Sequence, residues 1–168
     1  MKINKLIYFC CFFFIVIEIF AQPETINGIS INAPNGFVRS NAMGDEYLWI
    51  KFNKYQNASD YILVSYVIEN GPDFSKREEN CKKATRTTRF IKYENFWIKK
   101  TNIGVCYQLG DNDLLQGQFL IERNGITYIV FCNTYAGKDL KYKSDDYENP
   151  FENIEYMIGY MATRIKTY

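Results

Sequence analysis

The chain has 168 residues, contains no histidine, and carries 20 basic and 19 acidic side chains. This length suits one domain with a core of its own, and the near-neutral charge gives no general attraction to nucleic acid or anionic lipid. The missing imidazole excludes Ser-His-Asp and Cys-His catalysis, histidine-ligated zinc and histidine pH switches.

Residues 1–21 predict a secretory signal peptide. Two lysines precede an unbroken apolar run over residues 6–17, and Ala21 is a small residue suited to cleavage. A retained membrane anchor is the alternative, but Glu18 ends the run before the roughly 20 apolar residues that a span needs. We therefore expect an exported protein, periplasmic or secreted, with a single mature domain over residues 22–168 and no membrane segment after cleavage.

The first third of the mature chain predicts short strands. Residues 28–33 alternate apolar with polar side chains before a turn at Pro34-Asn35-Gly36. Residues 46–52 alternate in the same way, and residues 60–68 are rich in β-branched and aromatic side chains. Asn70-Gly71-Pro72 ends that third strand.

A short, exposed, polar helix is predicted over residues 75–86, before extended segments near residues 89–99 and 103–109. Its basic cluster invites a role in binding an acidic partner, but Glu78 and Glu79 balance the charge, which favours a salt-bridged surface helix. The basic residues of this cluster are Lys82, Lys83, Arg86 and Arg89.

Three cysteines follow the leader, and an exported protein meets an environment in which thiols pair. Cys81 and Cys106 are the predicted disulfide, closing a loop worth on the order of 3 kcal/mol. Cys132 stands in register with Val130 in an apolar strand, where a small buried hydrophobe is the usual role. These spacings match neither a zinc site nor a Cys-x-x-Cys redox pair, so we expect no metal and no cofactor.

The clearest local signal is a hairpin of residues 117–123 and 126–134 around Asn124-Gly125, because both turn residues tolerate the positive φ of a type I′ turn. Both faces are apolar away from the turn, which predicts a central pair of strands covered on both sides. One face carries Phe119, Ile121, Tyr128, Val130 and Cys132, and the other carries Leu120, Ile129 and Phe131.

A C-terminal helix is predicted to start at Asn149-Pro150, with Glu152 three residues after the cap. Its apolar stripe fits a helix lying on a sheet, although a helix at an interface or on a membrane surface would show the same stripe. The stripe consists of Phe151, Ile154, Ile158, Met161 and Ile165.

This order of elements predicts an α+β fold with a largely antiparallel sheet and a C-terminal amphipathic helix packed on it. With the opening ISINAPNGF at residues 29–37 and PFENI at residues 150–154, the chain resembles the PsbP-like family of α+β sandwiches over residues 26–166. The resemblance implies a non-catalytic accessory or adaptor protein that binds other proteins, as several exported members do. It carries over no catalytic residue.

Two local patterns favour plain structural roles. Asp145, Asp146 and Glu148 lack the spacing and the glycine of an EF-hand, so they predict a solvated acidic loop before a helix. Asn57-Ala58-Ser59 matches the glycosylation sequon, but the leader resembles bacterial ones, whose hosts seldom use it.

No spacing of residues predicts catalysis, so we expect a non-enzymatic domain that docks on a protein in the envelope or outside the cell. The alternative is a carrier of a small apolar ligand in a pocket under the sheet and helix. A hydrolase using paired carboxylates ranks well behind both. The expected partner or ligand contacts are Trp49, Phe96 and Trp97.

Overall fold

A computed structural model of the chain describes residues 24–40, 46–67, 76–83, 88–98 and 101–165. Its elements are nine strands, two helices and a short 3-10 turn, η2 (Leu140–Tyr142). The helices are α1 (Arg77–Lys82) and α2 (Pro150–Ile165). The strands are β1 (Glu24–Ile26), β2 (Ile29–Ile31), β3 (Phe37–Ser40), β4 (Tyr47–Phe52), β5 (Ala58–Val67), β6 (Thr88–Ile98), β7 (Thr101–Gly110), β8 (Leu114–Arg123) and β9 (Ile126–Tyr135).

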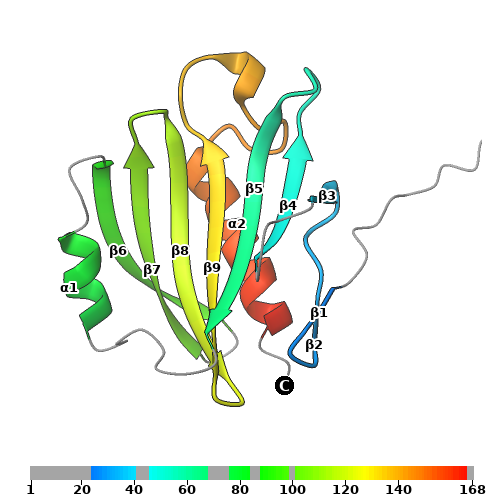
Figure 1. The fold of residues 1–168 in the computed structure, drawn as a ribbon. Coiled ribbons are helices and arrows are strands. Elements are labelled where there is room, and N and C mark those ends of the chain that lie inside the picture. Colours follow the sequence, from blue (N-terminus) through cyan, green and yellow to red (C-terminus); the bar gives the residue numbers. More distant parts are fainter. Residues whose placement is uncertain (1–23, 41–45, 68–75, 84–87, 99–100, 166–168) are drawn as a thin grey trace, which may run out of the picture.

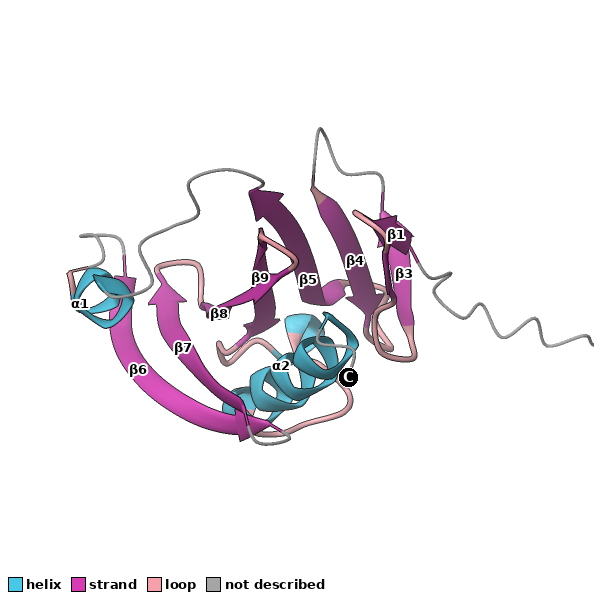
Figure 2. Cartoon of the chain, turned by 90° about the horizontal axis from the view of Figure 1, so that it is seen from below, coloured by secondary structure: helices cyan, strands magenta, loops and turns pink. Residues whose placement is uncertain are grey.

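Seven strands form one antiparallel sheet in the order β3-β4-β5-β9-β8-β7-β6, and β1 pairs with β2 separately (Figure 1). The predicted α+β class is confirmed. The sheet curves around α2, which lies along its concave side and contacts β8, β9 and β2 (Figure 2). We call the side of the sheet toward α2 the inner face and the opposite side the outer face.

Gly117 in β8 lets α2 approach the inner face closely. A Cβ at this position would lie 2.5 Å from Cγ2 of Ile154 and 3.0 Å from Cδ1 of Ile158. Both isoleucines are fully buried, together with Met157 and Met161 of the same helix. The predicted stripe of α2 therefore forms core, except that Phe151 is only half-buried.

The predicted hairpin is present, with Arg123 opposite Ile126 and positive φ at Asn124 and Gly125. It is central, as expected, because β7 and β5 flank it. Its two faces differ, however, from the expectation that both are covered. The described residues bury the inner set fully and leave the outer set, Leu120, Ile129 and Phe131, half-buried.

The ends of the two helices follow their sequence signals. Asn149 Oδ1 accepts a hydrogen bond from the Phe151 amide at 3.0 Å, and Asn149 Nδ2 donates to Glu152 at 3.3 Å, which caps α2. Glu78 and Glu79 of α1 form ion pairs with Lys82 and Lys83 one turn later, which confirms the predicted salt-bridged surface helix. The described helix is shorter than residues 75–86, and Arg86 lies outside the described residues.

No helix in the described ranges is both long and apolar enough to cross a membrane. The predicted signal peptide lies outside those ranges. Strands β1 and β3 and the turn η2 were not predicted from the sequence.

Candidate functional site

A row of apolar side chains crosses the outer face of the sheet. Leu48 on β4, Leu63 on β5 and Phe131 on β9 are direct cross-strand neighbours. Ile50 and Tyr61 form the adjacent pair on the same face, since alternate residues of a strand share a face. All five side chains are half-buried. Leu48, Leu63 and Phe131 are called the outer apolar row below.

A cavity of about 440 Å³ includes Leu48 and Leu63 of this row in its lining. Its walls are mostly apolar and aromatic, and η2 covers one side with Tyr142, which is 38% exposed. This volume and lining are typical of a site for a small ligand or for a side chain of a partner. The residues that line this tyrosine cavity are Leu48, Ala58, Ser59, Tyr61, Leu63, Asn112, Leu114, Asn133, Tyr135 and Tyr142.

The two asparagines of the tyrosine cavity have their amide oxygens engaged inside the protein. Asn133 Oδ1 accepts from Gln116 Nε2 at 2.9 Å, and Asn112 Oδ1 accepts from the Leu114 amide at 3.2 Å. Among the described residues, no hydrogen bond engages their NH₂ groups, which remain as donors. Burial, and then the nearby charge of Asp60, raises the pKa of Tyr61, so its hydroxyl stays neutral. The cavity thus suits an apolar group that carries hydrogen-bond acceptors.

The rim of the cavity is held by a turn and a loop far apart in sequence. Asn53, in the turn between β4 and β5, donates through Nδ2 to the carbonyl oxygens of Lys141 at 2.8 Å and Lys143 at 2.7 Å. The ring of Tyr142 packs edge-on against Tyr135, with centroids 5.4 Å apart. These contacts preform the cavity, which reduces the entropy lost on binding.

A buried carboxylate lies behind the cavity, on the inner face. Asp60 Oδ1 accepts from Thr134 and Asn153, each at 2.6 Å, while Oδ2 accepts from Ser144 at 2.8 Å and Ser59 at 2.9 Å. Four donors fill the acceptor positions of the carboxylate. Asp60 therefore acts as an anchor that ties β9, the first turn of α2 and the rim loop to β5.

The three aromatic residues expected to share one site do not meet. Trp49 is fully buried on the inner face of β4, whereas Phe96 and Trp97 lie on β6, at the far side of the sheet. Phe96 packs on Tyr107 inside, and Trp97 is 74% exposed on the outer face. The tyrosines of the cavity were missed, although the alternation in residues 60–68 places Tyr61 opposite the core.

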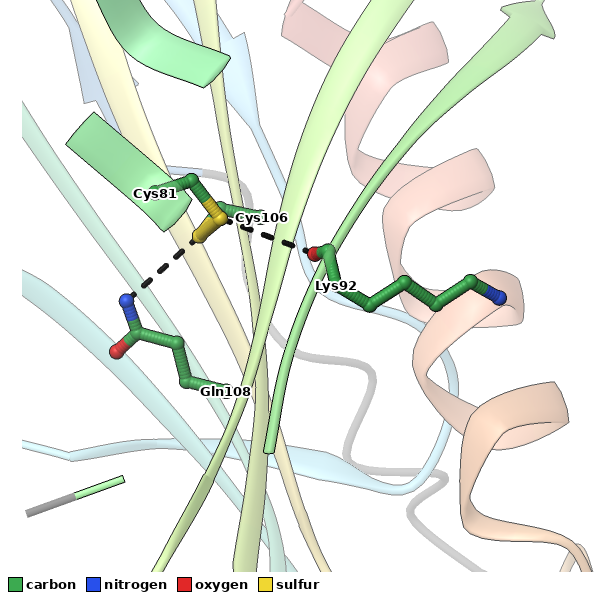
Figure 3. The surroundings of a disulfide bond; sticks show 4 residues. All are labelled: Cys81, Lys92, Cys106 and Gln108. Atoms are coloured by element: carbon green, nitrogen blue, oxygen red, sulfur yellow. Dashed lines mark hydrogen bonds between the residues drawn. A yellow bond between two sulfur atoms is a disulfide. The ribbon is translucent and has the colours of Figure 1, made fainter. Parts of the chain in front are cut away.

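The predicted disulfide between Cys81 and Cys106 is present, with Cα atoms 5.8 Å apart. Figure 3 shows it between α1 and the sheet, on the side away from α2, while the amine of Lys92 points toward α2. The Lys92 carbonyl oxygen lies 3.8 Å from Cys81 Sγ. Cys132 is a buried free thiol, as predicted, and burial raises its pKa.

Residues of the acidic loop and of the glycosylation sequon make contacts within the protein. Asp146 pairs with Lys51, and Asp145 accepts from the Lys54 amide. Within the described ranges, no group of three or more Asp, Glu, Cys or His side chains is placed to hold a metal ion. In the sequon, Asn57 donates to Lys141, and Ser59 is buried against Asp60.

No protein-family model matches the chain, and no curated protein matches it. Among solved structures, it is similar to one described as a mutant of the protein Mog1, with a TM-score of 0.56 and 12% identity. The alignment covers 86% of this chain and 94% of that one. At this identity the likeness shows the fold alone. The resemblance to the PsbP-like family is thus supported as an α+β fold, and membership stays a prediction.

Proposed function

We propose that the chain is an exported, non-catalytic accessory or adaptor protein that binds another protein of the envelope or cell exterior. The tyrosine cavity and the outer apolar row are the proposed binding surface. The observation that carries the proposal is their joint position: a preformed cavity of about 440 Å³ opens beside three half-buried apolar side chains on one face. Aromatic anchors in such preformed sites dominate protein interfaces.

Export is supported by two independent features. The leader has the charge and length of a cleavable signal. The disulfide between Cys81 and Cys106 suits an oxidising compartment. A protein that is periplasmic or secreted fits both features.

A non-catalytic role fits the chemistry around the proposed surface. Asp60, the buried carboxylate nearest the cavity, is saturated by four donors. The Cys132 thiol is buried on the inner face and kept protonated. Neither group is arranged to act on a molecule in the cavity.

Site-specific photocrosslinking in the native host tests the proposal. A photoreactive residue at Tyr142, on the cavity rim, should give one discrete adduct with a protein. The same residue at Tyr156, which is 43% exposed on α2, is the matched control and should not give that adduct. Leu63→Glu, in the outer apolar row, should abolish the Tyr142 adduct while the protein stays folded. Equal adducts at both positions, or an adduct that survives Leu63→Glu, would contradict the proposal.

The second candidate is a carrier for a small apolar ligand, and the cavity volume favours it. Native mass spectrometry of the mature protein from its host separates the two candidates. A retained protein supports docking, and a retained small molecule supports the carrier. The same spectrum reports the cleavage site and the mass loss of one disulfide.

A further inference from the structure

Hydrogen bonding by the two asparagines of the tyrosine cavity is one-sided. The amide oxygens of Asn112 and Asn133 already accept hydrogen bonds within the protein, and no described residue engages their NH₂ groups. The hydroxyl of Ser59, also in the lining, donates to Asp60 at 2.9 Å. The two amides therefore offer donors rather than acceptors. An occupant with carbonyl oxygens and few N–H groups would leave the fewest buried polar groups unpaired.

The lining of the cavity is also uncharged. Its ten described residues include three tyrosines and two asparagines, and none of the ten is Asp, Glu, Lys or Arg. Burial of a charged group without a partner is costly, so this lining suits an uncharged occupant. Tyr61, Tyr135 and Tyr142 supply aromatic rings. Neutral rings and carbonyl oxygens are therefore the chemistry that the lining matches.

The outer apolar row has the repeat of a polyproline II helix. Leu48, Leu63 and Phe131 lie on three adjacent strands, so the first and the last are two strand spacings apart, about 9.6 Å. A polyproline II helix has three residues per turn and repeats about every 9.3 Å. A segment in this conformation that crosses the strands would place residues i and i+3 over Leu48 and Phe131. Tyr61 and Asn133, paired two residues further along β5 and β9, would lie beside it.

Other backbone conformations match this surface less well. An α-helix bonds most of its carbonyl groups internally and offers few acceptors to the asparagine NH₂ groups. An added β-strand needs a free sheet edge, whereas β4, β5, β9 and β8 are interior strands. An extended segment without proline brings an N–H group with every carbonyl. Proline removes that N–H group and fixes the extended backbone before binding.

We propose that the tyrosine cavity and the outer apolar row bind a proline-rich segment of the partner in the polyproline II conformation. This inference rests on the proposed function, because it names the chemistry of the partner at the same surface. Proline rings pack on the aromatic and apolar side chains, and prolyl carbonyl oxygens accept from the NH₂ groups of Asn112 and Asn133. The segment and the cavity are both preformed, so little conformational entropy is lost on binding.

Titration of the isotopically labelled mature protein with capped decaproline, followed by NMR, tests this inference without the partner. Amides around the cavity on β4, β5 and β9 should shift and saturate, with a Kd of about 1 mM or below. The matched control is a capped peptide with three repeats of Leu-Gln-Gln, which keeps apolar side chains at every third position but carries an N–H group at each residue. It should bind at least about tenfold more weakly. Equal binding of the two peptides, or no saturable shifts with decaproline, would overturn the inference.

Two variants identify the groups that hold decaproline. Asn133→Asp keeps the acceptor for Gln116 but replaces the NH₂ donor by an oxygen that repels prolyl carbonyls, so the affinity should fall by about tenfold or more. Asn102→Asp, at an exposed position of β7, makes the same change away from the site and should leave the affinity unaltered. Asn133 is buried, so thermal melts check the fold, and Tyr142→Ala on the exposed rim should also weaken binding. Unchanged affinity in both Asn133→Asp and Tyr142→Ala would overturn the inference.

The photocrosslinked adduct separates this inference from the proposed function. Mass spectrometry of the adduct formed at Tyr142 identifies the partner segment in contact, which should contain prolines at three-residue intervals. A discrete adduct on a segment without proline would overturn the inference and leave the proposed function standing. Decaproline binding at the cavity without any protein adduct would support the inferred ligand chemistry and contradict the proposed function.

Discussion

The inner and outer faces of this sheet are built from the same strands but are buried to different extents. Phe119 on β8 faces α2 and is fully buried, whereas Phe131 on the neighbouring β9 faces outward and is half-buried. The inner face closes against a 16-residue helix; the outer face carries the tyrosine cavity. We therefore expect the inner face to contribute more to the stability of the fold than the outer face.

Truncation of these two phenylalanines tests most directly whether the two faces differ in their contribution to stability. Phe119→Ala should lower the free energy of unfolding by about 3–5 kcal/mol, because it leaves a cavity in a closed core. Phe131→Ala should cost about 1 kcal/mol, since its side chain is already partly in water. Chemical denaturation of both variants gives the two values. Equal losses would mean that the outer face is as much a part of the core as the inner face.

The disulfide is expected to have the next largest effect, and it acts on the outer face. Among the α1 residues whose side chains the structure describes, Cys81 is buried, and Glu78, Glu79, Asn80 and Lys82 are exposed. A helix of six residues is not stable by itself. The double change Cys81→Ser with Cys106→Ser should cost about 3 kcal/mol.

Hydrogen exchange locates this effect. In the double variant, amides of α1 should lose protection at a lower energy than amides of α2, because α2 is held by the inner core. Cys132→Ala is the matched control, since it removes a thiol and leaves the bridge intact. Uniform loss of protection across both helices would show that the disulfide stabilises the whole domain rather than one element.

Asp60 anchors the rim loop of the outer face to the inner face. Its substitution should have an intermediate effect on the free energy of unfolding. Asp60→Asn keeps the shape but replaces one acceptor oxygen by a donor that faces donors, at a cost of about 1–3 kcal/mol. The rim loop depends on Asp60 through Ser144, so labelling of a cysteine placed at Tyr142 should also become faster. Glu155→Gln, on the exposed side of α2, is the control and should change little. A rim that is unaffected would remove Asp60 from the support of the cavity.

Local chemistry predicted the best-defined elements of this fold. Asn124-Gly125 supplies the positive φ of the hairpin turn, and Asn149 caps α2 before Pro150. Alternation and β-branched content located β4 and β5 to within two residues. The disulfide followed from compartment and spacing. These features depend on residues that are neighbours in the sequence, so the sequence alone was enough to predict them.

The proposed site could not be predicted from the sequence, because it depends on the order of the strands in the sheet. Tyr61 and Tyr135 are distant in sequence, and the pairing of β5 with β9 places both in the lining of one cavity. Trp49 attracted attention as a large aromatic residue, but it faces inward and is fully buried. Composition gives the number of aromatic side chains, whereas the register of the sheet decides which of them reach the surface.

The smallest expected effect concerns proton binding by the inner face. Burial raises the pKa of the Cys132 thiol and of the Tyr107 phenol, with nearby carboxylates adding to the effect at Tyr107. At high pH the unfolded chain releases these protons before the native state does. The native state then binds more protons, so stability falls as the pH rises. No change from this source is expected between pH 6 and 8, and a decline should begin above about pH 9.

Two single changes separate the contributions of these groups. Cys132→Ala should remove the part of the decline that begins near pH 9, and Tyr107→Phe should remove the part that begins about one unit higher. Tyr107→Phe should also leave stability at pH 7 unchanged or slightly higher, because its hydroxyl is buried with no hydrogen-bond partner in the described part of the chain. If the decline were the same in Cys132→Ala, in Tyr107→Phe and in the wild type, burial of these two groups would not be its cause.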